Sequence, residues 1–251
     1  MNEDRRLVHI YNWWEADNST MERMLNAKRT WRKFYNNDKN GVLIADFNLG
    51  NAQRSSLSLG EKKTMPFLKD VISYGLAAYP DSGLFLYTNT DISLVTNASD
   101  FVRNSLSKWE CGYSHRVDFS EKDYPKNTIT RDQLKEKLPL GCWSAGSDIF
   151  FFTRRWWNEH EEILPDALIG FEAWDACVMA SMLKSGLPEP IKWISYHQKH
   201  LPYWKKYRLS SKGQLYNRRV CTEWAIKNNL GHLINNGTYL FKPPTPYNVV
   251  I

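Results

Sequence analysis

The sequence predicts an α/β fold in which helices flank a mostly parallel sheet, and two observations lead to this prediction. Short apolar runs, each typical of a buried strand, lie at 7–12, 41–47 and 84–87. Stretches with apolar residues at helical spacing, 21–35 and 65–79, lie between these runs. An alternation of strand, helix and strand is typical of parallel strands that are joined by right-handed crossovers.

The composition is that of a globular chain. Its 251 residues are 42% hydrophobic and 24% charged, which suffices for a sizeable core. The formal net charge of +6 permits a polyanionic partner or the diphosphate of a nucleotide, but the basic residues are not gathered in one tract. The four cysteines form no C-x-x-C pair, which argues against a zinc site or a disulfide framework.

The cellular setting is predicted from the same composition. Widely spaced cysteines favour reduced thiols and a cytoplasmic location. No apolar run approaches the ~20 residues that a membrane span needs. The charged amino-terminus has no apolar segment behind it, so we expect no signal peptide.

The first elements are justified by their turn and cap residues. The strand 7–12 ends in the polar Asn12, and the helix over 21–35 is predicted to be capped by Ser19 and Thr20. A turn rich in Asn and Asp precedes 41–47, which we expect to be a second buried strand.

A long polar loop is predicted at 48–63, before the next helix. Thr64 is the expected N-cap of the helix 65–79, and Pro66 suits its first turn because the backbone amide that proline lacks needs no partner there. The turn residues Pro80 to Gly83 then lead into the strand 84–87.

The remaining elements follow from the same patterns. Helices are predicted at 100–109, 131–137, 154–163, 171–184 and 215–227, and strands at 112–119, 149–152 and 192–197. We expect one large domain over 1–204 and a basic carboxyl-terminal extension, 205–251, packed on the same domain.

Polar residues follow the strand 84–87 at the point where it ends. They are Thr88, Asn89, Thr90 and Asp91. In open α/β sheets ligands bind at the carboxyl ends of the strands, and a carboxylate there can hold a divalent cation. Asn and Asp also cap ordinary turns, so the residues alone leave both interpretations open.

Three stretches in this order carry a resemblance to a known family. They are 65–72 followed by 87–92; 146–152; and 169–175 followed by 197–200. Together they resemble GT-A-type glycosyltransferases, the nucleotide-diphospho-sugar transferase superfamily. The resemblance implies a GT-A-like fold with Rossmann-like binding of a nucleotide-sugar donor. It also implies an enzyme of the EC 2.4 class, which transfers the sugar to a hydroxyl acceptor.

The resemblance also implies a metal site. In that superfamily a D-x-D motif at a strand end binds the metal and the donor diphosphate, and here the motif is Asn89-Thr90-Asp91. Asp91 and His197 are the implied ligands of a Mn²⁺ or Mg²⁺ ion, with His200 as second choice. The missing carboxylate weakens the case for a hard cation. Alternatively, the two histidines are surface groups beside a loop.

Candidate catalytic acids follow from the same resemblance. An inverting transferase needs a general base at the start of the helix after the acceptor loop, and Glu172 and Asp175 match that place. They lie at i and i+3, so both would face one side of a helix. Acids are also common at helix N-termini because the dipole favours them. Asp148 is expected beside the acceptor or the donor sugar.

The donor and acceptor contacts complete the expected site. The expected donor-binding residues are Asn12, Lys69, Asp70, Asn89 and Asp91. Trp143 and Trp174 would stack on a sugar, although core packing is the ordinary role of a tryptophan. Lys69 and Asp70 would otherwise form an ion pair on a solvated helix, and Arg54 is a candidate for phosphate binding.

The acceptor is open between a glycan and a hydroxymethylated pyrimidine in DNA. DNA would need phosphate contacts and aromatic groups around a flipped base. Its expected footprint is Arg154, Arg155, Lys205, Lys206, Arg208, Arg218 and Arg219 with Tyr203, Trp204 and Tyr207. The alternative function is a non-catalytic nucleic-acid-binding protein on a degenerate transferase fold. A sugar-nucleotide pyrophosphorylase is disfavoured because no basic glycine-rich loop lies near the amino-terminus.

Overall fold

A five-stranded sheet forms the centre of the protein. The computed structural model describes residues 4–13, 17–48, 65–144, 147–186, 190–200, 211–230, 234–235 and 238–239. The strand order is β2 (Val42–Asn48), β1 (Asp4–Trp13), β3 (Ser82–Thr88), β8 (Ile149–Thr153) and β5 (Cys111–Ser114). Four strands share one direction and β8 runs against them. This arrangement confirms the predicted α/β class with a mostly parallel, GT-A-like central sheet.

A smaller four-stranded sheet lies beside the first. Its order is β4 (Ile92–Leu94), β9 (Ser195–Gln198), β6 (Val117–Phe119) and β7 (Gly141–Trp143). β9 is antiparallel to β4 and parallel to β6. Since β4 follows β3 after a short turn, the small sheet begins where the central strand ends.

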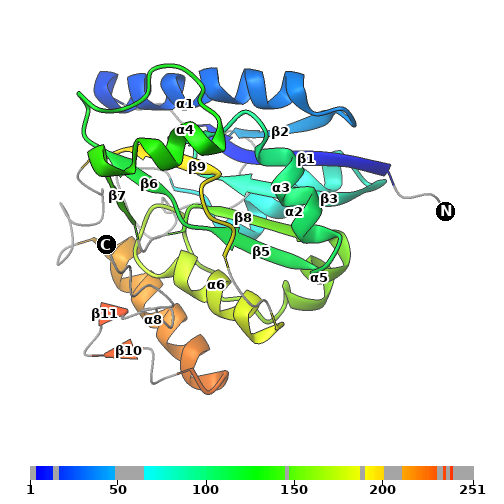
Figure 1. Cartoon of the computed structure of the whole chain (residues 1–251). Coiled ribbons are helices and arrows are strands. Elements are labelled where there is room, and N and C mark those ends of the chain that lie inside the picture. The colour runs from blue at the N-terminus through cyan, green and yellow to red at the C-terminus, as the bar shows by residue number, and fades with distance from the viewer. Residues whose placement is uncertain are drawn as a thin grey trace.

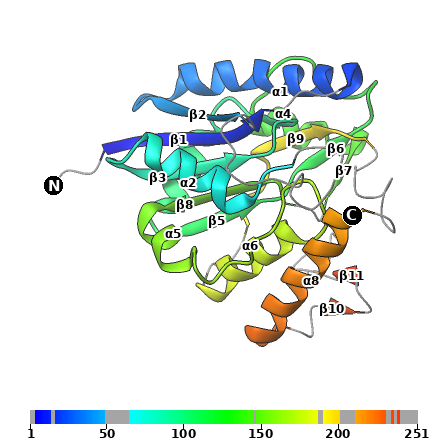
Figure 2. The ribbon, with the colours of Figure 1, turned by 180° about the vertical axis from the view of Figure 1, so that it is seen from behind.

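Helices cover both faces of the central sheet (Figures 1 and 2). The helices of the described ranges are α1 (Asn18–Asn37), α2 (Leu68–Ala78), α3 (Ala98–Leu106), α4 (Arg131–Glu136), α5 (Arg154–His160), α6 (Trp174–Lys184) and α8 (Lys212–Lys227). A short 3-10 turn, η3 (Leu138–Leu140), precedes β7, and a small hairpin pairs β10 (Ile234–Asn235) with β11 (Thr238–Tyr239). None of the helices within the described ranges is both long and apolar enough to cross a membrane.

Alternate residues of the central strands face two separate cores. On one side Val8, Ile10 and Phe85 pack with residues of α2, α5, α6 and α8. On the other side Leu7 and Leu86 pack with α1, α3 and the small sheet. Figure 1 shows this layering, with α1 on one side of the sheet and α6, then α8, on the other. The period-two alternation of a strand produces this division.

The predicted start of two helices is wrong. The N-cap of α1 is Asp17, whose carboxylate accepts from the amide of Thr20, so Ser19 and Thr20 lie inside the helix. α2 begins at Leu68 because Phe67 is extended and forms a bridge with Leu168. Pro66 therefore precedes the helix, while Thr64 lies outside the described residues.

Two predicted strands also differ from the structure. β2 is an edge strand, so alternate residues such as Ile44 and Asp46 face solvent while Ala45 and Phe47 are buried. The stretch 112–119 is two strands rather than one, because the chain leaves the central sheet after β5 and enters the small sheet as β6. The predicted loop 48–63 and its Arg54 lie almost wholly outside the described residues.

Candidate functional site

The carboxyl end of β3 meets the start of β8, and candidate residues gather at this edge. The two strands are antiparallel, with Thr88 opposite Ile149. The amide of Asn89 therefore reaches the backbone oxygen of Asp148 at 3.0 Å. The side chains meet as well, since Asn89 Nδ2 donates to Asp148 Oδ1 at 2.5 Å. Two predicted site residues, 59 positions apart in the chain, are thus in direct contact.

Asn89 is also tied to the strand beside it. The buried hydroxyl of Tyr87 donates to Asn89 Oδ1 at 2.7 Å and lies 3.2 Å from Asn12 Oδ1. Both polar groups of the Asn89 amide therefore face protein partners. Asn89 is thus in direct contact with Asp148 and is joined to Asn12 through the hydroxyl of Tyr87.

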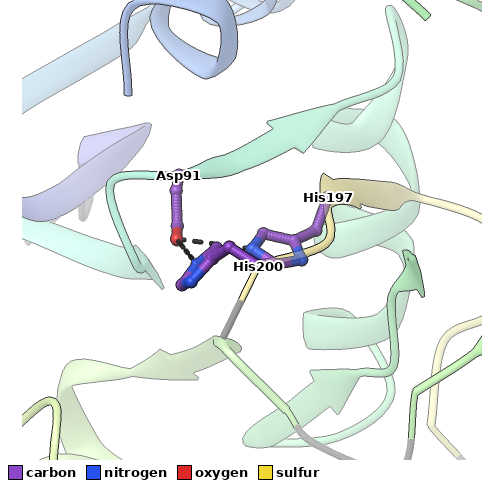
Figure 3. A group of neighbouring side chains, drawn as sticks. All are labelled: Asp91, His197 and His200. Carbon is purple, nitrogen blue, oxygen red and sulfur yellow. Dashed lines mark hydrogen bonds and ion pairs between the residues drawn. The ribbon is translucent and has the colours of Figure 1, made fainter. Parts of the chain in front are cut away.

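Asp91, His197 and His200 form the one group of three or more His, Cys, Asp or Glu side chains in the described part of the chain that could hold a metal ion (Figure 3). Their ligand atoms all lie within 4.8 Å of one another. Asp91 Oδ2 is 2.9 Å from His200 Nε2 and 3.4 Å from His197 Nε2. Asp91 and His197, the two predicted ligands, therefore lie beside His200, which was the second choice.

The register of the small sheet explains this convergence. β9 is paired on both sides, and His197 stands opposite Ile92 of β4 and Asp118 of β6. Asp91 immediately precedes Ile92, so its carboxylate reaches the histidine from the β3–β4 turn. His200 follows β9 by two residues and approaches the same carboxylate. Figure 3 shows both rings directed at Asp91.

The electrostatics of the cluster favour charged partners. Burial alone would raise the pKa of Asp91, but the neighbouring His197 and His200 outweigh it and hold that pKa well below its usual range. Burial alone would lower the pKa of His197, but the carboxylates of Asp91 and Asp118 raise it instead. The cluster thus holds the carboxylate of Asp91 in its ionised form, which is the form that ligates a cation.

The donor set fits a divalent transition ion. Bonds of about 2.1 Å place neighbouring ligand atoms roughly 3 Å apart, which is close to the spacings from Asp91 to the two histidines. Imidazole nitrogen suits transition ions, and oxygen ligands suit Mg²⁺. One carboxylate with two imidazoles therefore fits Mn²⁺ or a softer ion better than Mg²⁺.

Two residues that the sequence analysis missed connect this cluster to Asp148. Asp118 Oδ1 lies 3.0 Å from His197 Nδ1 and accepts from Arg116 Nε at 2.8 Å. The guanidinium of Arg116 also forms an ion pair with Asp148. The alternation Val117-Asp118-Phe119 signals an outward acid, because both apolar neighbours are fully buried. No local pattern marks Arg116.

Asp175 lies at the N-terminus of α6, at the same edge. Its neighbour Trp174 packs edge-on against Tyr87 and Phe150, which anchors the helix start beneath β3 and β8. Burial raises the pKa of Asp175, opposed by hydrogen bonds from backbone amides, including that of Ser147, and by the charge of Arg116. A carboxylate with a raised pKa is a better proton acceptor than an ordinary aspartate.

Glu172 is placed differently from Asp175. It lies before α6, because Ala173 adopts a left-handed conformation with φ of 82° and the helix begins at Trp174. The expectation that the two acids share one helix face is therefore wrong. The Glu172 carboxylate instead accepts from Gln214 at 2.5 Å and from Arg218 at 3.1 Å, both on α8.

The two tryptophans that were predicted to stack on a sugar, Trp143 and Trp174, differ in burial. Trp174 is 4% exposed and belongs to the core, while Trp143 is half-buried and packs on Trp193 with ring centroids 4.4 Å apart.

Lys69 and Asp70 lie in the first turn of α2. That turn follows β2 and lies toward the carboxyl ends of the strands, because the other end of α2 is bonded through Arg154 to the start of β3.

The expected DNA footprint is divided where the structure describes it. Arg154 donates to the backbone oxygens of Leu76, Tyr79 and Ser82, at the amino end of β3. Asp91 follows the other end of this strand, roughly 20 Å away at ~3.3 Å per residue. Arg218 is paired with Glu172. The footprint residues between 203 and 208 lie outside the described residues.

Comparisons with known proteins found structural similarity only. No protein-family model matches the chain, and no curated protein sequence matches it. The chain is similar to the crystal structure of a glycosyltransferase involved in the glycosylation of the major capsid of PBCV-1. That similarity has a TM-score of 0.40 and 10% identity, over 83% of this chain and 90% of that one.

A second solved structure is similar to the chain at a comparable level. It is 4-diphosphocytidyl-2C-methyl-D-erythritol synthase from Anaerococcus prevotii, with a TM-score of 0.35 and 9% identity over 85% of this chain and 99% of that one. At these scores neither similarity assigns an activity, a substrate or a partner to this chain.

Proposed function

We propose that the protein is a glycosyltransferase that moves a sugar from a nucleotide-diphospho-sugar to a hydroxyl acceptor. The observation that carries this proposal is the gathering of Asp91, His197 and His200 at the carboxyl end of β3. Asp148 and Asp175 lie at the same edge, within one network of contacts. Transfer from a diphosphate donor needs a group that stabilises the charge of the leaving diphosphate and an acid or base that moves a proton, and a metal site beside two carboxylates supplies both.

Asp91, His197 and His200 would hold the divalent metal. When bound, a divalent cation neutralises the charge that develops on a leaving diphosphate. Because two of the three ligand atoms are nitrogens, we assign Mn²⁺ rather than Mg²⁺ as the preferred ion. Asn89 is not among the ligands, because both ends of its amide are occupied by Tyr87 and Asp148.

The other residues would take up the proton of the acceptor and contact the sugar and the donor. Asp175 takes the proton of the acceptor hydroxyl, a role supported by its raised pKa. Asp148, held by Asn89 and Arg116, contacts the sugar that is transferred. Asn12 at the end of β1, with Lys69 and Asp70 at the start of α2, contacts the donor. Trp143 is the remaining candidate for an acceptor contact.

We propose a glycan as the acceptor. Arg154 and Arg218 are bonded to protein partners, so these two members of the expected DNA footprint are occupied. A hydroxymethylated pyrimidine in DNA is the rival acceptor, and the test includes it.

A release assay tests the proposal. The full chain is incubated with a panel of nucleotide sugars, with Mn²⁺, with Mg²⁺ or with EDTA, and nucleoside diphosphate is measured. Each donor is run without acceptor, with oligosaccharides, and with hydroxymethylated DNA. The proposal requires Mn²⁺-dependent release of diphosphate that an acceptor accelerates. Loss of release in Asp91→Ala, with the melting temperature preserved, would tie the activity to the cluster.

The same assay separates the rival functions. Release from no donor, together with DNA binding that weakens steeply with salt, would favour the non-catalytic nucleic-acid-binding protein. Acceleration by hydroxymethylated DNA alone would replace the glycan by DNA and leave the rest of the proposal standing.

A further inference from the structure

Arg116 and Asp118 connect the metal-binding cluster to Asp148 through side-chain contacts at the start of β6, in the small sheet. Asp118 is the direct cross-strand neighbour of His197, with the two Cα positions paired between β6 and β9. Val117 and Phe119 on either side are fully buried, so strand alternation turns Asp118 away from the core, toward His197. Its place is therefore fixed by the sheet.

The contact between Asp118 and His197 selects one ring nitrogen. Asp118 Oδ1 lies 3.0 Å from His197 Nδ1, and the opposite nitrogen, Nε2, faces Asp91 at 3.4 Å. A carboxylate that accepts a hydrogen bond from Nδ1–H favours the tautomer in which Nε2 keeps its lone pair, which is the form that can ligate a metal. His197 is 4% exposed, so no bulk water competes for this contact.

Arg116 extends the arrangement in the other direction. Its Nε donates to the same Asp118 oxygen at 2.8 Å, and its Nη1 forms an ion pair with Asp148 Oδ2. A guanidinium holds two carboxylates in a fixed geometry because its donors lie in one rigid plane. The side chains of Arg116, Asp118 and Asp148 are each less than one-fifth exposed, at 18%, 12% and 14%.

We propose that Asp118 and Arg116 form a positioning bridge, in which Asp118 orients His197 for the metal and Arg116 couples that histidine to Asp148. This inference rests on the proposed metal-dependent function. Neither residue contacts the metal or the substrate, so both are positioning residues. The bridge links the group that holds the diphosphate to the group that contacts the sugar.

Metal affinity tests the first half of the bridge. Mn²⁺ binding to the full chain is measured by isothermal titration calorimetry and by electron paramagnetic resonance, alongside the metal-free melting temperature. We expect Asp118→Ala to weaken Mn²⁺ binding by about 10- to 100-fold, with Asp118→Asn in between because its amide oxygen still accepts a hydrogen bond from His197 Nδ1. Asp132→Asn, which removes the same charge from an exposed site on α4, should bind as wild type does.

Each outcome of this titration decides something. Wild-type affinity in Asp118→Ala would overturn the bridge while the proposed function stands. No Mn²⁺ binding by the wild-type chain would overturn the metal site and the bridge together. If Asp118→Ala does not fold, Asp118→Asn carries the test, and equal affinity in it and the wild type would count against orientation by a charged carboxylate.

A double-mutant cycle tests the second half. Asp148→Asn lies outside the metal cluster, yet it should lower Mn²⁺ affinity if Arg116 couples the two regions. In an Arg116→Gln background the same change should have no further effect. Arg116→Lys keeps the charge but not the planar fork, so it should lose part of the coupling. Additive effects of Arg116→Gln and Asp148→Asn would refute the coupling.

Discussion

Asn89 donates to Asp148 through its side-chain nitrogen and accepts from Tyr87 through its oxygen. A residue at the first position of a D-x-D pattern is expected to face a cation. Here it faces protein partners on both sides. An amide suits this position, because it can donate to Asp148 through its nitrogen and accept from Tyr87 through its oxygen at the same time.

The first prediction introduces an acid at position 89. Asn89→Asp places a second carboxylate against Asp148, so we expect a loss of about 1–3 kcal/mol in the free energy of unfolding of the metal-free protein. We expect no gain in Mn²⁺ affinity, because the side chain points at Asp148 and Tyr87. Urea unfolding and Mn²⁺ titration measure the two effects. A tenfold tighter Mn²⁺ complex in this variant would show that position 89 is a ligand after all.

The second prediction concerns His200 as the third ligand. His200→Ala and His197→Ala should each weaken Mn²⁺ binding at least about tenfold, since each removes one of three ligands. His160→Ala is the matched control, because His160 on α5 stacks on Trp156, away from this cluster. If His200→Ala binds Mn²⁺ as tightly as His160→Ala does, the cluster has only two protein ligands.

We expect the same position, 200, to influence which ion binds. His200→Asp replaces an imidazole by a carboxylate, and carboxylates suit Mg²⁺ better than imidazoles do. We therefore expect the ratio of Mg²⁺ to Mn²⁺ affinity to rise in this variant. Parallel calorimetric titrations with the two ions measure the ratio. A ratio unchanged from the wild type would argue that His200 lies outside the coordination sphere.

The central strand and its polar end are predictable from the sequence alone. Residues 84–87 are apolar because β3 lies between β1 and β8, covered on both faces, and the change to polar residues marks the edge of the sheet. Asp91 and His197 could be paired through the family resemblance. The hydrogen bonds of the Asn89 side chain could not be predicted, because one of them depends on Asp148, which lies 59 residues later, just before β8.

The contacts of Arg116 and Asp118 were not predictable for a related reason. They belong to a stretch that was expected to continue a single strand, whereas the chain changes sheets between β5 and β6. The role of Asp118 follows only from the pairing of β6 with β9, 79 positions away at His197. The prediction that Glu172 lies in the helix failed because Ala173 has a positive φ, which an alanine does not signal in a sequence.

The third prediction assigns the base. Asp175→Asn should lower kcat by about 10²- to 10⁴-fold and leave donor affinity nearly unchanged. The raised pKa of Asp175 means that folding disfavours its ionised form, so this residue contributes stability below its unfolded pKa and loses it as pH rises through the folded pKa. The neutral variant should therefore melt no lower than the wild type at pH 7. Steady-state kinetics and calorimetry measure both; equal losses of kcat and donor affinity would make Asp175 a binding residue.

The fourth prediction concerns Glu172. Its carboxylate joins the start of α6 to α8 through Gln214 and Arg218, so Glu172→Gln should cost about 1–3 kcal/mol of stability. The kcat of the folded variant should remain close to that of the wild type. A kcat loss as large as that of Asp175→Asn, with normal stability, would return Glu172 to the catalytic role expected from the sequence.

The last prediction uses His9, whose ring is fully buried between Tyr35 and Thr88, with both nitrogens at 2.8 Å from a hydroxyl. Burial lowers the pKa of His9 to about 3 from its ordinary 6.5. In the unfolded chain His9 therefore binds a proton below about pH 6.5, whereas in the folded protein it stays neutral until the pH is near 3. The free energy of unfolding falls as pH drops through this window. Between pH 7 and pH 5 the loss from this residue is about 2 kcal/mol.

His9→Gln separates this effect from all other titrations, because a glutamine can bond the same two hydroxyls without taking up a proton. Urea unfolding at pH 7 and pH 5 gives the change in unfolding free energy for each protein. We expect the wild type to lose about 2 kcal/mol more than the variant over this interval. An equal loss in the two proteins would mean that His9 accepts a proton in the folded state, and that the buried contact with Thr88 at the end of β3 opens in mild acid.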